Sequence, residues 1–425
     1  MSESSEFRAS APARISLFVG KGGVGKSTLA AATAVCDSGA GQRVLLVSTD
    51  QAHSLGDVLG ISVPPTGRGE PVRVLADLET GRSGSDGGFL DALALDTLAL
   101  LEDRWRDVVD ALDRRFPGSE LSSVAPEELS ALPGIQEVLG LHAVGELATS
   151  GRWDRVVVDC ASTADALRML TLPATFGLYV ERAWPRHRRL AIDDNRSAAL
   201  VELLERTSAS VDRLSALLTD GDLVGAHLVL TPERVVAAEA ARTLGSLALM
   251  GIRVEELLIN QVLVRDETYE YRSLPDHPAF YWYAERISEQ RAVLQELDAT
   301  IGDLALVLVP HLSGEPIGPK ALGGLLDSAR RRRGSAPPGP LRPIVDLESG
   351  SGLESVYRLR LALPQLDPGS LSLGRADDDL IIRAGGVRRR VRLASVLRRC
   401  TVLDAQLRGS ELTVRFRPNP EVWPT

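Results

Sequence analysis

The sequence predicts an α/β fold, a doubly wound parallel sheet with a helical insert, followed by a small antiparallel β-sandwich. Short apolar runs recur along the first 330 residues and end at glycine-rich or acidic segments, as buried strands of parallel sheets do. Stretches with apolar residues three and four positions apart lie between them and indicate helices. After residue 343, apolar and polar residues alternate between turns that contain Asp and Gly, which is typical of antiparallel strands.

Length, composition and net charge indicate a folded globular protein and argue against a nucleic-acid-binding or membrane-spanning one. The chain has 425 residues, enough for two to three domains of about 150 residues each. Hydrophobic residues make up 44% and charged residues 25%, which predicts a folded globular protein. The net charge of −9 argues against nucleic acid as a partner. No apolar run reaches the roughly 18 residues of a membrane span, and the N-terminus lacks a secretory signal, so we expect a cytoplasmic protein without an integral membrane segment.

The three cysteines, Cys36, Cys160 and Cys400, lie far apart along the chain and form no Cys-x-x-Cys pair. We therefore expect neither a disulfide framework nor a zinc site. Lysine is equally rare, since only three of the 48 Lys and Arg residues are lysines. Two of them, Lys21 and Lys26, fall within one short segment, which indicates that a compact ammonium group is needed there.

That segment follows the first predicted strand, Ile15 to Val19. Residues 20–28 read GKGGVGKST and match the GxxxxGK[ST] pattern of a phosphate-binding loop, with a helix predicted directly after it. Backbone N–H groups of such a loop turn toward phosphate oxygens, and the helix N-terminus adds partial positive charge. We expect ATP here, with Lys26 on the β- and γ-phosphates and Ser27 on Mg²⁺. The predicted nucleotide-binding residues of the loop are Gly20, Lys21, Gly22, Gly23, Val24, Gly25, Lys26, Ser27 and Thr28.

The basic loop pattern does not require Lys21. The form GKGGVGK resembles the deviant Walker A loop of the group that contains MinD/ParA, the nitrogenase iron protein and ArsA. The resemblance implies that Lys21 reaches across a dimer interface to the partner's nucleotide. It therefore implies a catalytic role for Lys21 beside Lys26, and a homodimer.

Asp50 follows the next predicted strand, Arg43 to Ser48. Carboxylates at the carboxyl ends of parallel strands face the ligand crevice, so Asp50 can orient a water toward the γ-phosphate and contact Mg²⁺ through water. Residues 49–59, TDQAHSLGDVL, resemble switch I of the ArsA arsenite-efflux ATPases and of the guided-entry ATPases that deliver tail-anchored membrane proteins. In that family the first Asp is catalytic, which implies the same role for Asp50. Gln51 stands where the family usually has proline.

Asp159 directly follows a third predicted strand, Arg155 to Val158. Its position is Walker B-like, which predicts that it holds Mg²⁺ through water. The segment 159–170, DCASTADALRML, resembles switch II of the same family, although Ser162, Ala164 and Asp165 replace its usual Pro, Gly and His. An alanine is stiffer than a glycine, and Asp165 adds negative charge near an anionic ligand, so slow hydrolysis is one expectation.

Two further features resemble the adenine side of the family's site. Asn260, on a predicted strand from Val254 to Leu263, matches the adenine-contacting Asn, and residues 307–318, with Pro310, match the last strand and the loop over the base. The order of these features implies a P-loop NTPase. We predict a disordered N-terminus at residues 1–12 and an ArsA-type ATPase domain at 13–329. Its helical insert is expected at about 85–145 and 185–222, followed by a linker at 330–343 and the β-sandwich at 344–425.

The insert begins with apolar residues at helical spacing from Phe89 to Leu112, which predicts a helix. In tail-anchor carriers this region forms a client groove that is usually rich in methionine. None of the three methionines of this chain lies in the insert, which favours an ordinary core over a groove. The tail has alternating runs at 357–363, 380–384, 387–393 and 411–416, and it resembles the α-crystallin-type (small heat-shock) domain of some ArsA-like ATPases.

The resemblance implies a Mg²⁺-dependent ATPase of the ArsA or guided-entry type. ATP binding and hydrolysis in a homodimer would be coupled to binding or transfer of a client, such as a hydrophobic or membrane protein. Two alternatives stay open. The first is a nucleotide-gated, chaperone-like binding protein that hydrolyses little ATP, and the altered switch II motivates it. The second is an arsenite-stimulated subunit of an anion pump, although three dispersed cysteines make a converging thiolate site difficult.

Overall fold

The computed structural model describes residues 11–50, 54–67, 70–76, 87–104, 106, 135–168, 170–171, 205, 209–210, 212–263, 276–302, 304–332, 342–364 and 366–423. By its internal contacts the chain divides into two units. The first comprises Met1–Gly225 and Leu312–Ala329, and the second comprises Ala226–His311 and Arg330–Thr425. Most of the predicted disordered N-terminus, residues 1–10, lies outside the described residues.

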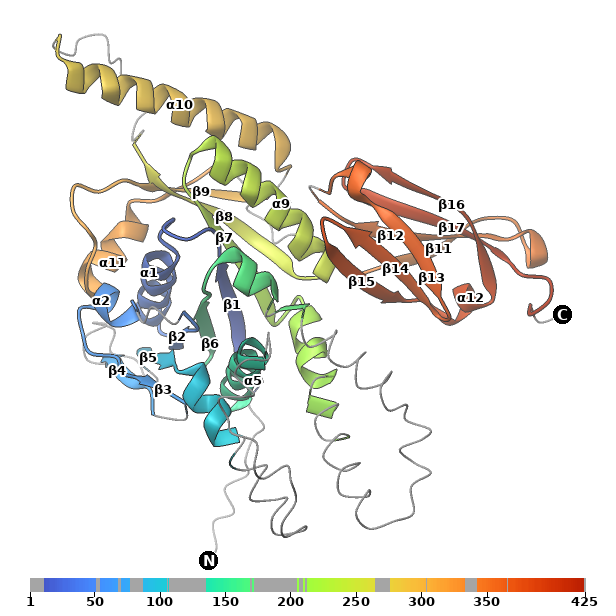
Figure 1. Ribbon diagram of the computed structural model, residues 1–425, viewed down its shortest axis with the longest axis horizontal. Coiled ribbons are helices and arrows are strands. Elements are labelled where there is room, and N and C mark those ends of the chain that lie inside the picture. The colour runs from blue at the N-terminus through green and yellow to red at the C-terminus, as the bar shows by residue number, and fades with distance from the viewer. Residues whose placement is uncertain are drawn as a thin grey trace, which may run out of the picture. The chain divides into compact units, whose positions relative to one another are not determined.

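The first unit is built on a parallel sheet in the strand order β1-β6-β2-β5-β3, with β4 antiparallel to β5 (Figure 1). Strands β1, β2 and β6 are buried along almost their whole length, as expected when helices cover both faces of a sheet. Figure 1 shows α1 and α5 on either side of β6, which confirms the doubly wound architecture. The elements are β1 (Arg14–Val19), α1 (Lys26–Gly39), β2 (Arg43–Ser48), α2 (Leu55–Leu59), β3 (Pro65–Thr66), β4 (Val72–Leu75), β5 (Phe89–Leu95), α5 (Ile135–Thr149), β6 (Arg155–Asp159) and α11 (Pro319–Asp327).

The prediction of a helix from Phe89 was wrong for its first seven residues. Phe89–Leu95 form β5, which pairs in parallel with β2. A short, wholly apolar run fits a buried parallel strand as well as a helix, and burial on both faces decides for the strand. Helix follows at residues 97–104, and α5 and residues 212–219 are helical as predicted. The other parts of the predicted insert, 107–134 and most of 185–211, lie outside the described residues.

The second unit begins within β7 and contains the strand order β7-β8-β9-β10. β8 and β9 are parallel, whereas β10 is antiparallel to β9. The prediction that the linker starts at Arg330 was therefore wrong by two residues, because Arg330 and Arg331 pair with Leu308 and Val307 as β10. The elements of this part are β7 (Val224–Leu230), α9 (Arg234–Met250), β8 (Arg253–Val262), α10 (Pro278–Thr300), β9 (Ala305–Pro310) and β10 (Arg330–Arg331).

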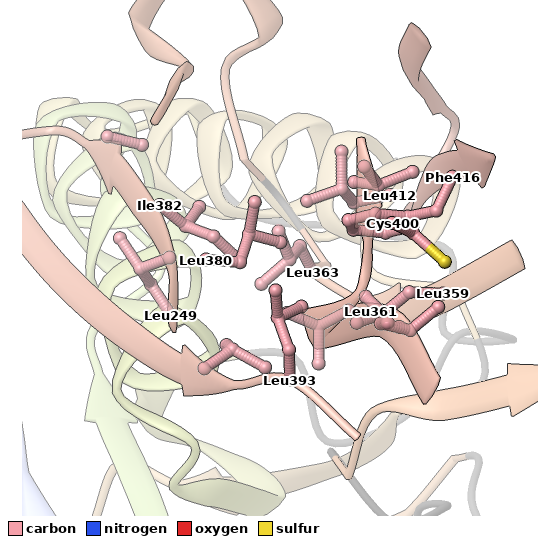
Figure 2. Close-up of a cluster of buried hydrophobic side chains, with 14 residues drawn as sticks. Leu249, Leu359, Leu361, Leu363, Leu380, Ile382, Leu393, Cys400, Leu412 and Phe416 are labelled. Carbon is pink, nitrogen blue, oxygen red and sulfur yellow. The ribbon is translucent and has the colours of Figure 1, made fainter. Parts of the chain in front are cut away.

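The tail has two antiparallel sheets, β11-β12-β17-β16 and β13-β14-β15, and confirms the predicted β-sandwich. The four predicted strands correspond to β12, β14, β15 and β17, whereas β11, β13 and β16 were not predicted. Leucines of β12, β14 and β17 form one buried cluster with Phe416 (Figure 2). The elements are β11 (Ile344–Ser349), β12 (Val356–Ala362), β13 (Ser372–Ala376), β14 (Asp379–Ala384), β15 (Val387–Arg392), α12 (Ser395–Arg398), β16 (Cys400–Arg408) and β17 (Glu411–Pro418).

One member of the tail's core cluster comes from outside the tail. Leu249, in the last turn of α9, is fully buried beside Leu380 and Ile382 (Figure 2). Arg389 of β15 pairs in register with Ile382 and donates to the main-chain oxygen of Ala248 at 3.2 Å. Burial lowers the pKa of Arg389 to about 10, and the negative end of the α9 dipole offsets part of the cost of that buried charge.

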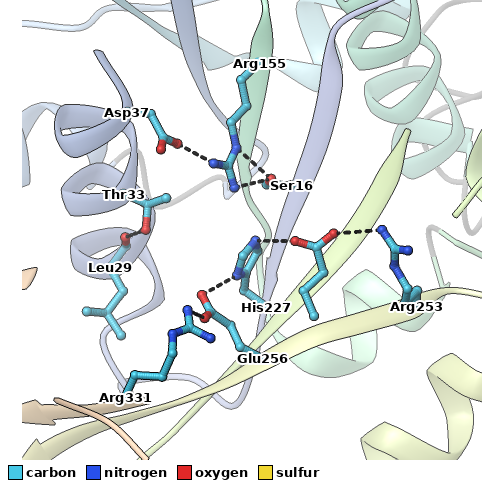
Figure 3. Close-up of polar contacts among 10 residues, drawn as sticks. Ser16, Leu29, Thr33, Asp37, Arg155, His227, Arg253, Glu256 and Arg331 are labelled. Atoms are coloured by element: carbon cyan, nitrogen blue, oxygen red, sulfur yellow. Dashed lines mark hydrogen bonds and ion pairs between the residues drawn. The ribbon is translucent and has the colours of Figure 1, made fainter. Parts of the chain in front are cut away.

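A polar network centred on the buried His227 ties β7, β8 and β10 together (Figure 3). The Nδ1 atom of His227 lies 2.9 Å from Glu256 Oε1, and its Nε2 lies 3.7 Å from Glu255 Oε2. Arg331 of β10 pairs with Glu256 at 2.5 Å. Burial alone would raise the pKa of Glu256, but contacts with His227 and Arg331 lower it on balance. The network anchors β10 to β8, the strand that carries Asn260.

Candidate nucleotide site

The glycine-rich loop joins β1 to α1. Gly23 has φ of 81° and Gly25 has φ of 91°, in a backbone region that side-chain-bearing residues rarely adopt. A Cβ atom placed on Gly22 or Gly23 would meet no atom within 4 Å, so both glycines border open space. Gly25 precedes the first turn of α1, whose N–H groups have no side-chain cap. Phosphate oxygens are the partners that such a loop and helix terminus favour.

Lys26 opens α1 and brings its charge to the loop. Its side chain is only 7% exposed, and Nζ donates to the main-chain oxygen of Lys21 at 3.3 Å. Lys21 itself is exposed. The ammonium of Lys26 is thus held against the loop. Burial removes water from this charged group, and an anion bound in the loop would compensate for that loss.

A hydrogen-bonded triad fixes α1 on the sheet (Figure 3). Arg155, the first residue of β6, donates to the Ser16 hydroxyl of β1 and pairs with Asp37 of α1 at 2.6 Å. No sequence motif marks this contact, because its three residues lie far apart along the chain. Its effect is to hold the helix that carries Lys26 against β1 and β6.

Asp159 lies fully buried at the carboxyl end of β6. Its Oδ2 accepts a hydrogen bond from the Ser48 hydroxyl at 3.3 Å, whereas its Oδ1 is buried without a hydrogen-bond partner among the described residues. Burial raises the pKa of Asp159 to about 6, even though Ser27, Lys26 and Ser48 lie close enough to lower it. A buried carboxylate oxygen without a partner, next to the Ser27 hydroxyl, fits the oxygen ligand set of Mg²⁺.

Asp50 follows β2 and lies close to Asp159. Its backbone N–H donates to the Ser48 hydroxyl at 3.2 Å, so one serine links the two predicted acidic residues. The negative charge of Asp50 contributes to the raised pKa of Asp159. Thr49 adds two bonds to the Asp159 main-chain oxygen, from its N–H at 3.0 Å and its hydroxyl at 3.3 Å. Residues 51–53, which include Gln51, lie outside the described residues.

The altered switch II segment forms a local cap on the helix that starts at residue 163. The Ser162 hydroxyl donates to Asp165 Oδ2 at 2.7 Å and accepts from the Asp165 N–H at 3.3 Å. Arg168 lies 4.0 Å from the same carboxylate. The negative charge predicted to disfavour an anionic ligand is therefore engaged by neighbours on its own helix.

The predicted adenine contacts belong to the second unit. Asn260 of β8 is buried, and Pro310 ends β9 opposite Val262. Between Asn260 and Val262 the strand bulges, with Gln261 at φ of 59°. The buried Gln290 of α10 supports this bulge, donating to Gln261 O at 3.1 Å and accepting from Leu263 N at 2.9 Å. Gln290 was missed by the sequence analysis, because its helix carries no recognisable motif.

Sequence comparisons decide the family. Residues 13–328 match the family described as Anion-transporting ATPase, and residues 354–416 match the HSP20-like domain found in ArsA.

The chain belongs to the anion-transporting ATPase family.

Several known proteins are similar to this chain. Protein Rv2184c of Mycobacterium tuberculosis is 85% identical over 418 residues, which are 98% of each chain. Uncharacterized protein SCO2128 of Streptomyces coelicolor is 32% identical and covers 97% of this chain and 99% of its own. The Arsenical pump-driving ATPase of Acidiphilium multivorum is 30% identical over 322 residues, which are 73% of this chain and 48% of that protein.

Membership confirms the predicted architecture, a P-loop ATPase domain followed by an HSP20-like domain, and it supports ATP as the nucleotide. Among the described residues, no helix has the length and apolar character needed to cross a membrane. The three cysteines are unpaired, and Cys160 and Cys400 are buried. Burial raises the pKa of Cys160 to about 12, so this thiol stays protonated at neutral pH.

Proposed function

We propose that this chain is a cytoplasmic, Mg²⁺-dependent ATPase of the ArsA or guided-entry type that works as a nucleotide-switched homodimer. ATP binding and hydrolysis would drive binding or transfer of a protein client. The observation that supports this most strongly is the buried Asp159 carboxylate, which lies beside Ser27 and whose Oδ1 has no geometrically well-formed hydrogen bond among the described residues. A cation bound there removes the cost of burying that charge.

Each predicted residue has a role in this proposal. Gly20 to Gly25 and Thr28 enclose the phosphates, and Lys26 neutralises charge on the β- and γ-phosphates. Ser27 would hold Mg²⁺, with Asp159 and Asp50 acting on it through water. The chemistry that the ion would supply is neutralisation of charge on the phosphate oxygens.

Asp50 orients the attacking water, and its backbone is already held by Ser48. Lys21, which is exposed, would reach the nucleotide of the partner subunit. Asn260 and Pro310 would contact the adenine. The HSP20-like domain favours a protein as the client, because the edge strand of an antiparallel sheet can pair with a strand of another chain.

Single-turnover hydrolysis of radiolabelled ATP, with protein in excess, tests the chemistry. We expect hydrolysis that requires Mg²⁺ and that Asp50→Asn and Lys26→Ala each slow by roughly 10²–10³-fold. Asp50→Asn should still bind ATP, because the residue acts on water rather than on phosphate. Hydrolysis at the same rate in the wild type and in both variants would contradict the assignment.

A nucleotide-gated binding protein is the second candidate. The internal cap formed by Ser162 and Asp165 favours it, because a segment engaged with itself responds weakly to a γ-phosphate. Bound ATP that stays intact for hours in the same assay would select this candidate.

An arsenite-stimulated pump subunit is a third possibility, since some relatives are named arsenical pump-driving ATPases. The protonated thiol of Cys160 is a poor arsenite ligand. An ATPase rate that does not change when arsenite is added would eliminate this possibility.

A further inference from the structure

Ser54 belongs to the segment that resembles switch I and directly precedes α2. Ser54 occupies the N-cap position of α2, where a serine hydroxyl ordinarily accepts a hydrogen bond from its own helix. Here the hydroxyl makes no such capping bond. It instead faces the phosphate loop, where its Oγ lies 3.4 Å from the Oγ of Ser27.

The Ser27–Ser54 separation is too long for a well-formed bond between hydroxyl groups, which has a usual length of about 2.7–2.8 Å. Two oxygens that bind one Mg²⁺ ion at neighbouring octahedral positions, each about 2.1 Å from the metal, lie about 2.9 Å apart. A closure of about half an ångström would therefore let both hydroxyls bind one ion. The spacing suits a shared partner better than a direct bond.

A second, independent observation points to the same place. Asp159 is fully buried, and its Oδ1 has no hydrogen-bond partner among the described residues although it lies next to Ser27. Three oxygens from β6, α1 and the start of α2 thus converge, and all of them are hard ligands of the kind Mg²⁺ prefers.

Ser54 is also held firmly in place. It directly precedes Leu55, which is fully buried, and Leu59 one turn later is buried as well. The main-chain oxygen of Val58 accepts a hydrogen bond from Gly318 at 2.9 Å. A ligand on such an anchored turn needs little ordering when the metal binds.

We propose that Ser54 is a second direct protein ligand of the nucleotide-bound Mg²⁺, beside Ser27. The inference rests on the proposed ATPase function and adds to it a contact through which switch I senses the metal.

A change of metal preference tests direct ligation. In Ser54→Cys, a soft sulfur replaces the hard oxygen, so the site should lose affinity for Mg²⁺ and gain affinity for Cd²⁺. The readout is binding of a fluorescent ATP analogue, titrated with Mg²⁺ or Cd²⁺, which needs no turnover. We expect the ratio of half-saturating Mg²⁺ to half-saturating Cd²⁺ to rise by roughly 10–100-fold over the wild type.

Ser48→Cys is the matched control. Its hydroxyl contacts the other oxygen of Asp159, Oδ2, at 3.3 Å, so the same substitution there should weaken the site without a preference for Cd²⁺. The same titration of the wild type measures any binding of Cd²⁺ by the three native cysteines. An unchanged metal ratio in Ser54→Cys, or an equal change in Ser48→Cys, would overturn the proposal.

Two further variants guard against a misfolded cysteine variant. Ser54→Thr keeps a hydroxyl and should bind Mg²⁺–nucleotide like the wild type, whereas Ser54→Ala should bind it roughly tenfold more weakly. Equal Mg²⁺ dependence in the two variants would refute direct ligation. If the wild type binds the nucleotide equally well with and without metal, this inference fails, whereas the ATPase function is tested separately by single-turnover hydrolysis.

Discussion

Replacing Asp159 with asparagine should stabilise the protein when nucleotide and metal are absent. Burial raises the pKa of this carboxyl from its ordinary value of 3.8 to about 6. Above pH 6 the group is charged in both the folded and the unfolded state, and the folded state bears the cost of burying the charge. Below pH 3.8 it is protonated in both states, and the cost disappears. The size of the shift corresponds to about 3 kcal/mol at pH 8.

The pH profile of this effect can be worked out from the same two values. The advantage of Asp159→Asn over the wild type in free energy of unfolding should be small at pH 4 and should grow as the pH rises through 5 and 6. It should level off near 3 kcal/mol at pH 8. Urea unfolding in EDTA, followed at several pH values, measures the difference.

Asp154→Asn provides a control of opposite sign, because hydrogen bonds from Arg43 lower the pKa of Asp154. That variant should lose stability toward neutral pH, by a small amount because the pair is partly exposed. If Asp159→Asn differed from the wild type by the same amount at every pH, the reasoning about the buried charge would be wrong. With saturating Mg²⁺ and ATP, the wild type should have the higher free energy of unfolding of the two, because its Asp159 carboxylate then has a cation nearby.

Three further predictions address other parts of the chain. Leu249→Ala should destabilise the tail by about 2–5 kcal/mol in urea unfolding, because it opens a cavity in a packed core, whereas Leu353→Ala, at an exposed position, should have little effect. Gln290→Ala should weaken ATP binding about tenfold in a titration without changing its Mg²⁺ dependence, because it removes two hydrogen bonds from the strand bulge next to Asn260. Adding arsenite should leave the ATPase rate unchanged, and a rise of several-fold would contradict the assignment of Cys160 as an inert thiol.

The phosphate loop could be predicted from sequence because its chemistry is local. Glycines at positive φ, a lysine and a hydroxyl must follow one another in one loop between a strand and a helix, and a pattern of nine residues contains all of them. Asp50 and Asp159 were predictable for a related reason, since parallel strands bring their carboxyl ends to one edge. Ser48 lies between them and was not predicted, because its role depends on hydrogen bonds to a strand more than a hundred residues away.

Other features depend on tertiary packing that the sequence does not display. The run from Phe89 to Leu95 fits both a helix and a strand, and only its neighbours in the sheet decide between them. The unpredicted β16 is mostly exposed, so its residues lack the alternation that marks a half-buried strand. The contribution of Leu249 to the tail's core is a contact between segments far apart in the chain, and helical periodicity alone does not show what a helix packs against.

The central claim is a homodimeric ATPase in which Lys21 of one subunit acts on the nucleotide of the other. The most direct test measures specific ATPase activity against protein concentration for the wild type, for Lys21→Ala and for Lys320→Ala as a control at another exposed lysine. The account predicts that activity per protein rises with concentration in the wild type and in Lys320→Ala, and that Lys21→Ala abolishes it. Activity that is independent of concentration and unaffected by Lys21→Ala would contradict the claim.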